Sequence, residues 1–356
     1  MKDRIRLIKD LTNADGISGF EDEVVGLVRE YAKDLAEVRE DRMRNVFLYR
    51  KGNKGNRPVV MLDAHTDEIG FMVQSINGKG LIKFIPIGGW SPQNVSAHKV
   101  RIRNKRGETV KGVIVSKPPH FMSEAEKSAS PKMENMLIDV GANSREEVVD
   151  RFGIEVGNPI CPDVDFEYNG TNNVMCAKAF DDRIGVATVL CILDSLQGEE
   201  LNVDVVCALS TQEEVGMRGA QVTSNRIDPH VALVFEGTPA DDVYTGEHDC
   251  QAGLKKGPQV RHRDASMITH PRFLAFARKI AIEAAIPFQD AVREGGGTDA
   301  GAIHIKHNGV PSVVIGIPSR YIHTHYAYCA YEDFENAVKW GCEIVRRLDK
   351  EAIEAL

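Results

Sequence analysis

The chain has 356 residues, of which 42% are hydrophobic and 27% are charged, enough for one large core or two unequal domains. Its net charge of −8 argues against a nucleic-acid partner, because such a partner requires a dense basic face. No apolar run approaches the roughly 18 to 20 residues of a membrane span, and the N-terminal segment resembles an amphipathic helix, not a signal peptide. Seven cysteines without C-x-x-C spacing are typical of reduced thiols. We therefore expect a cytoplasmic protein without a membrane partner.

The first part of the chain has helical periodicity. It predicts a helix over residues 4–14 and a second over residues 21–35, with Ser18 and Glu21 in capping-box spacing before the second. A buried strand over residues 58–65 follows. From about residue 69 to residue 170 the pattern changes to short alternating runs separated by glycine, which predicts a small antiparallel β-barrel or sandwich.

Within that region, the basic stretch 98–112 alternates with apolar residues. This pattern favours a β-hairpin that turns at Asn104 to Gly107 over a nucleic-acid-binding face.

Helices and strands alternate again from residue 171 onward. Nearly continuous apolar strands between amphipathic helices predict an α/β sheet that is covered on both faces. We expect one α/β domain formed by residues 1–68 and 171–356, with an all-β domain of residues 69–170 inserted into it. The expected strands cover residues 202–211, 230–237 and 311–318, and the expected helices cover residues 183–196, 271–285 and 331–348.

Potential metal ligands follow several of these strands, where open α/β sheets gather their ligands. A histidine after a strand is more often structural, and an aspartate before a helix is usually an N-cap, so each residue alone is weak evidence. Four such strand ends in one sheet favour a metal site. Histidine and carboxylate without thiolate suit catalytic zinc, cobalt or manganese. The residues are His65 and Asp67, Asp181 and Asp182, Glu213 and Glu214, Glu236, and His323 and His325.

Two ions close together need a carboxylate that binds both, and Asp181 is the natural bridge because it lies in a loop before a helix. Asp67 is interpreted as an acid that orients His65 and supports catalysis, with substrate binding or capping of the turn as alternatives. Adjacent residues that leave a strand point in different directions. Glu214 is therefore predicted as a ligand and Glu213 as the general base.

Six ordered segments resemble those of the tetrahedral aminopeptidases, which include glutamyl aminopeptidases and proteins long labelled endoglucanase M. With IGGWSPQ, the resemblance covers essentially the whole chain. It implies a zinc-peptidase α/β/α sandwich with a mixed sheet and an inserted PDZ-like barrel for dimerisation. It also implies peptide substrates and dimers that assemble into tetrahedral dodecamers. The segments are DAHTDEIGFMV, AKAFDDRIG, TQEEVGMRGA, FEGTPADD, GGGTDAGAIH and IPSRYIHTH.

The resemblance also implies a two-metal aminopeptidase that acts through a water between the metals, with Glu213 as the base. One metal would be held by His65, Asp181 and Glu236, and the other by Asp181, Glu214 and His323. Glu236 departs from the family pattern, where Asp is more usual. The added methylene puts the geometry of that metal in doubt.

The glycine-rich segment 294–303 fits a substrate wall, because glycine lets a ligand approach the backbone closely. Its expected substrate contacts are Gly296, Gly297, Thr298 and Asp299, and the alternative is a flexible loop that caps a helix beginning near Asp299.

Three further interpretations stay open in the sequence. Arg183 either holds a carboxylate or lies on a helix surface. His325 is an alternative metal ligand. A basic segment suits acidic substrate residues if it runs near the pocket, and is otherwise a surface loop or an oligomer contact; its cations are Lys255, Lys256, Arg261 and Arg263.

Other functions compete with the aminopeptidase. A two-metal deacylase or carboxypeptidase would use the same site on another amide bond, since fold does not dictate substrate. A glycosidase needs two carboxylates that flank a sugar and no metal pair, so the histidine-rich ligand set argues against it. A metal-dependent binding protein without turnover would not need Glu213.

Overall fold

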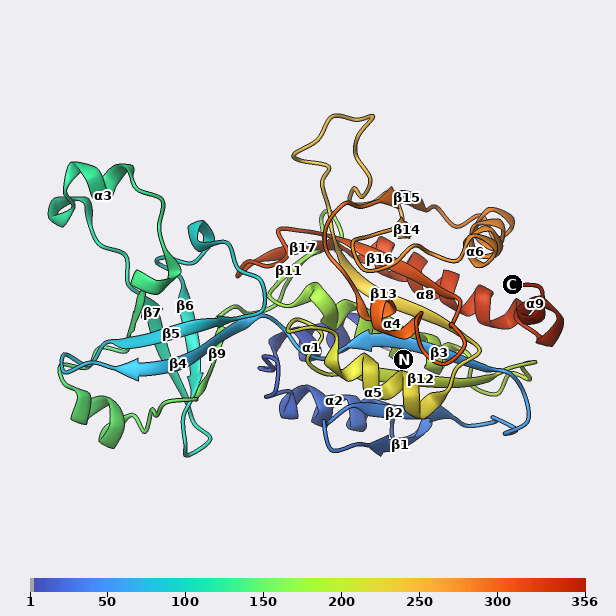
Figure 1. Cartoon of the computed structure of the whole chain (residues 1–356), viewed down its shortest axis with the longest axis horizontal. Coiled ribbons are helices and arrows are strands. Elements are labelled where there is room, and N and C mark those ends of the chain that lie inside the picture. Colours follow the sequence, from blue (N-terminus) through green and yellow to red (C-terminus); the bar gives the residue numbers. More distant parts are fainter. Residues whose placement is uncertain (1–2) are drawn as a thin grey trace.

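In the computed structural model, which describes residues 3–356, an 11-stranded mixed sheet forms the body of the molecule and a closed β-barrel projects from one side (Figure 1). The barrel appears in cyan and green at the left of the view. The predicted α/β fold with an inserted all-β unit is therefore confirmed at this level.

The centre of the large sheet is a set of parallel strands. β3 (Val59–His65) lies between β12 (Asp204–Ser210) and β13 (Val231–Pro239), and β16 (Ser312–Arg320) follows β13. All residues of β12 are buried, as expected for a strand covered on both faces. The other strands of the sheet are β1 (Ala36–Glu40), β2 (Val46–Arg50), β10 (Glu167–Asn169), β11 (Val174–Ala177), β14 (Gln259–Arg263), β15 (Gln289–Val292) and β17 (Ala327–Ala330).

Helices lie on both faces of the sheet because consecutive residues of its strands point to opposite sides. Val60 and Leu62 join the larger core cluster, whereas Met61 joins a second cluster on the other face. Helices α1 (Arg4–Asn13), α2 (Asp22–Ala32), α4 (Phe180–Ser195), α6 (Pro271–Glu283) and α8 (Tyr331–Arg347) contribute to the larger cluster, α5 (Arg218–Ile227) and α7 (Asp299–Ile303) contribute to the second, and α9 (Lys350–Glu354) ends the chain.

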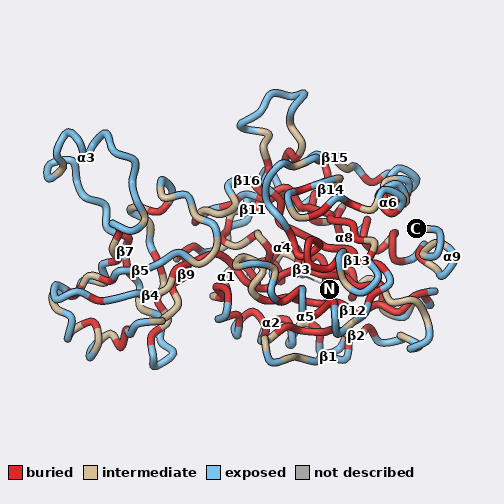
Figure 2. Tube along the Cα trace, in the orientation of Figure 1, coloured by how far each residue is buried: buried red, intermediate tan, exposed pale blue. Residues whose placement is uncertain are grey.

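The barrel has its own apolar core, which includes Phe71, Phe84 and Ile102. Pairing of Phe71 with Ile160 brings its first and last strands together, so the chain enters and leaves the barrel at adjacent points. The long connection over residues 115–136 is mostly exposed (Figure 2). The strands are β4 (Gly70–Ile76), β5 (Ile82–Ile87), β6 (Lys99–Arg103), β7 (Thr109–Ile114), β8 (Leu137–Asp139) and β9 (Pro159–Pro162), with α3 (Glu124–Ser128), a π-helix at Glu147–Arg151 and 3₁₀ turns at Pro92–Asn94, Pro119–Phe121 and Met133–Asn135.

The predicted hairpin at 98–112 is present as β6 and β7, and the backbone N–H of Asn104 donates to the carbonyl of Glu108 at its turn. The predicted end of the insert at residue 170 differs from the structure. The last barrel strand ends at Pro162, and β10 already belongs to the large sheet because it pairs with β11.

The predicted capping box at Ser18 and Glu21 is wrong. Glu21 is the N-cap residue of α2, and within the described chain its side chain makes no capping bond. The Ser18 hydroxyl instead donates to Asp67 Oδ2 at 2.6 Å. A carboxylate is a stronger acceptor than a neutral group, so this tertiary contact outweighs the local one.

Across residues 3–356, no helix combines the length and the apolar character that crossing a membrane requires. The seven cysteines all fall within that range and are free thiols, most of them buried.

Candidate metal centre

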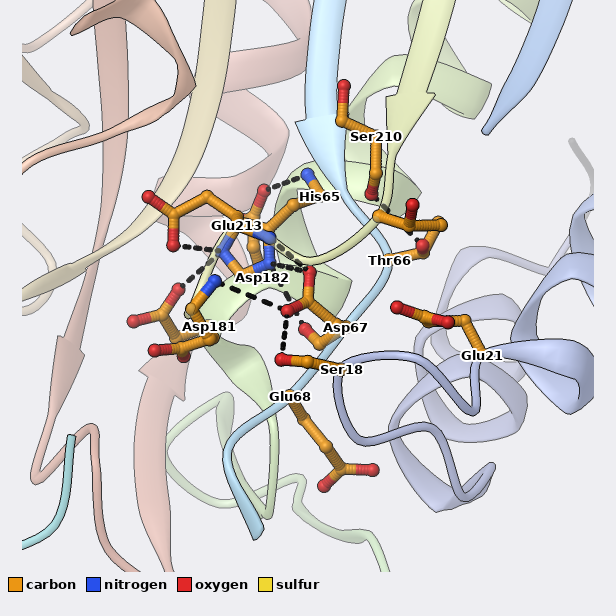
Figure 3. A network of polar contacts seen from close by, with 12 residues as sticks. Ser18, Glu21, His65, Thr66, Asp67, Glu68, Asp181, Asp182, Ser210 and Glu213 are labelled. Atoms are coloured by element: carbon orange, nitrogen blue, oxygen red, sulfur yellow. Dashed lines mark hydrogen bonds and ion pairs between the residues drawn. The ribbon is translucent and has the colours of Figure 1, made fainter. Parts of the chain in front are cut away.

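The predicted ligands meet at one edge of the large sheet. Because β3, β12, β13 and β16 run parallel, their carboxyl ends share this edge. His65 ends β3, Glu236 lies in β13, and Glu213 and Glu214 follow β12, while His323 follows β16. Figure 3 shows His65, Asp67, Asp181 and Glu213 pointing toward one another.

Asp181 lies between the two histidines. Its Oδ1 is 3.1 Å from His65 Nε2, and its Oδ2 is 3.3 Å from His323 Nε2. Asp181 and Asp182 have non-helical backbone angles at the start of α4, which directs their side chains toward the sheet edge. Each oxygen of Asp181 therefore faces a different imidazole, as a bridging carboxylate requires.

Each histidine also lies close to the carboxylate of a different glutamate. Glu236 Oε1 is 3.3 Å from His65 Nε2, and Glu214 Oε1 is 3.6 Å from His323 Nε2. The side chain of Glu213, the residue before Glu214, faces His65 instead, and its Oε2 lies 3.9 Å from His65 Nε2. The adjacent glutamates thus face different histidines.

Burial strongly perturbs these acids. It raises the pKa of Glu213 to about 8, and Glu236 and Asp67 add repulsion while His65 opposes the shift. Burial also raises the pKa of Glu214 and of Glu236 well above the usual range. Burial alone would raise the pKa of Asp181, but hydrogen bonds from His323 and His65 hold it below its usual range. So many crowded carboxylates need a compensating positive charge.

The donor set fits divalent metal ions. One group of close ligand atoms is His65, Asp181 and Glu214, and another is His65, Asp182 and Glu236, with the atoms of each group within 4.8 Å of one another. Buried Glu214 Oε1 and Glu236 Oε2 have no hydrogen-bond partner among residues 3–356. Buried unpaired carboxylate oxygens are costly unless a cation binds them, and nitrogen with oxygen ligands suits zinc and related metals.

Asp67 is buried beside the candidate ligands and contacts three of the residues of the site. It accepts hydrogen bonds from the backbone N–H groups of Glu213 and Glu214, at 2.9 and 3.2 Å, and its Oδ1 is 3.3 Å from His65 Nδ1. Its side chain is fully buried, which disfavours the alternative of substrate binding. Asp67 therefore orients His65 and also holds the turn that presents both glutamates.

The sequence named Asp182 only among the potential ligands and gave it no specific position, yet its carboxylate joins three segments of the site. Its carboxylate accepts hydrogen bonds from the backbone N–H groups of His65, Gly185 and Gly237, at 3.1, 3.0 and 2.9 Å. These bonds connect the end of β3, the start of α4 and the strand that contains Glu236. The available signal was the paired aspartate in AFDDRIG, where only the first residue was assigned as the bridging ligand.

Arg183 is fully buried, so the alternative of a helix-surface residue is wrong. It donates to the Thr66 carbonyl at 2.8 Å and lies 3.3 Å from Glu68 Oε1, which Lys178 also contacts. The carboxylate that it holds is thus Glu68, beside the site.

His325 stacks on His98 with ring centroids 4.2 Å apart, and burial lowers its pKa to about 3. None of the groups of close ligand atoms found in the described part of the chain includes it.

A cavity of about 600 Å³ opens over the site. Its glycine wall includes the predicted Gly296 and Gly297. Thr298 and Asp299 are 0% and 1% exposed at the start of α7, so the structure places them behind this wall and not at its surface. The remaining lining residues are Gly89, Asp181, Glu213, Glu214, Met217, Glu236, Gly237, Pro239, Arg261, Arg293, Gly295, Ile322 and His323.

The four cations of the basic segment do not lie together: one lines the cavity and three lie at the surface. Arg261 lines the cavity, whereas Lys255, Lys256 and Arg263 are exposed. Arg293 also lines the cavity and was missed, because it stands alone in a stretch that predicts only a loop.

Fold and site together define a metal-dependent hydrolase built on an open α/β sheet. Residues 44–340 match the model of the M42 glutamyl aminopeptidase family, and the chain belongs to this family. The family resemblance seen in the sequence is confirmed, and with it the predicted aminopeptidase class.

Relatives match over nearly the full chain. The glutamyl aminopeptidase of Lactococcus lactis subsp. cremoris (strain MG1363) is 32% identical over 352 residues, covering 97% of each chain. The lysyl aminopeptidase of Pyrococcus furiosus is 32% identical over 349 residues, covering 96% of each.

Solved structures agree with this assignment. The TET aminopeptidase of the marine sediment archaeon Thaumarchaeota archaeon SCGC AB-539-E09 is 40% identical, with a TM-score of 0.95 over 99% of both chains. The TET1 peptidase of Pyrococcus horikoshii, which can assemble into a tetrahedron or a large octahedral shell, is 27% identical. Its TM-score is 0.87, over 97% of this chain and 100% of that one.

Proposed function

We propose that this chain removes N-terminal residues from peptides with two divalent metal ions bound at the sheet edge. His65, Asp181 and Glu236 hold one ion, and Asp181, Glu214 and His323 hold the other. The position of Asp181 between two histidines, each with its own glutamate, supports this assignment. The ligand set favours zinc or cobalt, with manganese as a third candidate.

When bound, the ions polarise the peptide carbonyl and make the attacking water more acidic. Glu213 accepts a proton from that water at its carboxylate and passes it to the nitrogen of the leaving amine. Asp67 keeps Glu213 in place through the backbone N–H bond of 2.9 Å. The free α-amine of the substrate would bind close to a metal ion or to an acidic residue of the site, which makes the enzyme an exopeptidase.

A panel of chromogenic aminoacyl substrates with matched N-acetylated compounds tests this function. We expect cleavage of the free-amine compounds only, and loss of cleavage after chelation with recovery on return of Zn²⁺ or Co²⁺. The competing two-metal deacylase or carboxypeptidase predicts cleavage of the blocked compounds, and that result would contradict the aminopeptidase assignment.

We also propose a preference for acidic N-terminal residues. Arg261 and Arg293 both line the cavity. Arg261 is held by Asp264 at 2.9 Å, and Arg293 is held by Asp241 at 2.8 Å, so both are fixed in place. Fixed guanidinium groups bind carboxylates well because little side-chain entropy remains to be lost.

Replacing Arg293 by Gln tests this preference. Loss of one charge-assisted hydrogen bond, worth roughly 1.5 to 3 kcal/mol, should lower kcat/KM for a glutamyl substrate by about 10- to 100-fold. The value for a leucyl substrate should change little. Arg278→Gln on α6 serves as the control, since Arg278 pairs with Asp290. Equal effects of Arg293→Gln on both substrates would contradict the proposal.

For the architecture, we propose that residues 1–68 and the chain from β10 onward form a zinc-peptidase-like sandwich domain. The inserted barrel, whose strands run from Gly70 to Pro162, forms the PDZ-like dimerisation domain, and dimers build a dodecamer. The tetrahedral assembly of the TET1 relative and the exposed barrel connection support this assembly. The free cysteines are consistent with the proposed cytoplasmic location.

A further inference from the structure

The two histidines of the site are held very differently. The His65 side chain is 1% exposed and is fixed by burial, whereas that of His323 is 39% exposed. His323 also lies in a turn with a backbone φ of +58°, outside any strand or helix. Packing alone therefore does not determine where the His323 ring points.

A backbone carbonyl of the inserted barrel contacts this ring. The Gly89 oxygen lies 2.8 Å from His323 Nδ1. A carbonyl oxygen can only accept, so Nδ1 must carry the proton and donate it. In the neutral ring this leaves the Nε2 lone pair free, and Nε2 is the atom that faces Asp181 and Glu214. The contact therefore selects the tautomer that binds a metal.

Two adjacent glycines, Gly88 and Gly89, allow the barrel loop to come this close to His323. A Cβ added to Gly89 would lie 3.0 Å from His323 Nδ1. Gly88 has a φ of +78°, and a Cβ there would lie 2.5 Å from Ile69. Glycine at both positions thus lets the loop between β5 and the following 3₁₀ turn reach the site.

Trp90 fixes the same loop to the barrel. Its indole Nε1 donates to the Gly70 carbonyl at 3.1 Å, and its ring stacks on Phe71 with centroids 4.6 Å apart. Phe71 is fully buried in the barrel core. These contacts tie the position of the Gly89 carbonyl to the barrel, and the Trp90 ring also lies 5.2 Å from that of His325 in the α/β body.

We propose that the inserted barrel completes the metal centre, with Gly89 and Trp90 as positioning residues that hold His323 ready to bind the second ion. This inference rests on the proposed two-metal function. It gives the barrel a role within a single chain, separate from dimerisation.

The experiment titrates metal-free full-length protein with Co²⁺ by calorimetry and records the Co²⁺ absorption spectrum. Wild type should bind two ions. Gly89→Ala should keep one ion tightly and bind the other about 10- to 100-fold more weakly, as expected when a partner of a metal-binding histidine is lost. Its spectrum should change only in the part that belongs to the weaker ion.

Gly78→Ala is the matched control, because Gly78 is also in the barrel and a Cβ there meets no atom within 4 Å. Trp90→Leu is the second variant and should weaken the same ion, while Trp90→Phe, which retains a ring to stack on Phe71, should restore much of the affinity. Gly89 is exposed and its φ lies outside the left-handed region, so its variant should fold.

Unchanged affinity for both ions in Gly89→Ala and Trp90→Leu would overturn this inference and leave the proposed function intact. Equal weakening of both ions would also overturn it, because the effect would then be general. Failure of wild type to bind two ions would overturn the two-metal function as well, so the two failures are distinguishable.

Discussion

Replacing Glu213 by Gln is expected to leave both metal ions bound and to lower kcat by about 10²- to 10⁴-fold, the usual contribution of a general base. The substitution keeps the shape of the side chain but removes its ability to accept a proton. The nearest histidine atom lies 3.9 Å from Glu213, farther than from Glu214 or Glu236, so metal affinity should be little affected. Metal content by elemental analysis and kcat on an aminoacyl substrate are the measurements.

The neighbouring residue provides the control for this variant. Glu214→Gln makes the same chemical change one position along, but there it removes a charge from a predicted ligand. It should lower metal content as well as turnover. Retained activity in Glu213→Gln would remove its role as base, and loss of metal from that variant would mean that the two glutamates have been assigned the wrong way round.

Replacing Asp181 by Ala should have the largest effect on metal content. Its two oxygens face His65 and His323 separately, so their loss removes a ligand from both proposed ions. We expect at least one of the two ions to be released and turnover to disappear with it. Metal content after exhaustive dialysis, with a melting curve to establish folding, checks this result.

Asp290→Ala is a suitable control, because Asp290 is an exposed aspartate paired with Arg278. A count that stays at two ions per chain in Asp181→Ala would show that another residue forms the bridge. Asp182 would then be the first candidate, since it lies with His65 and Glu236 in the second group of ligand atoms.

The central strands could be predicted from the sequence because strands that are buried on both faces consist mostly of apolar residues. β3, β12, β13 and β16 are runs of apolar residues, and the parallel order of their ends brings the predicted ligands together. By contrast, β1 has only one buried residue, at Ala36, and β10 has none, so these edge strands carry little apolar signal. Their existence depends on pairing with neighbours, which local patterns do not encode.

The missed parts of the site share one physical cause. Ser18 has ideal spacing for a cap, but its partner Asp67 lies far along the chain. The contact between Gly89 and His323 spans 234 positions, and Arg293 reaches the cavity from a loop. Motif spacing reports which residue types occur near a strand end. It does not report which distant backbone group will meet them.

The chain enters and leaves the inserted barrel at adjacent points, because Phe71 of its first strand pairs with Ile160 of its last. A module with neighbouring ends can be gained or exchanged in evolution without disturbing the host sheet. Here the host strand β3 ends at His65 and the barrel begins at Gly70, so the module was placed beside the reacting groups. Its loop at Gly89 therefore reaches a proposed metal ligand, so exchanging the module is expected to weaken metal binding as well as to change the shape of the enzyme.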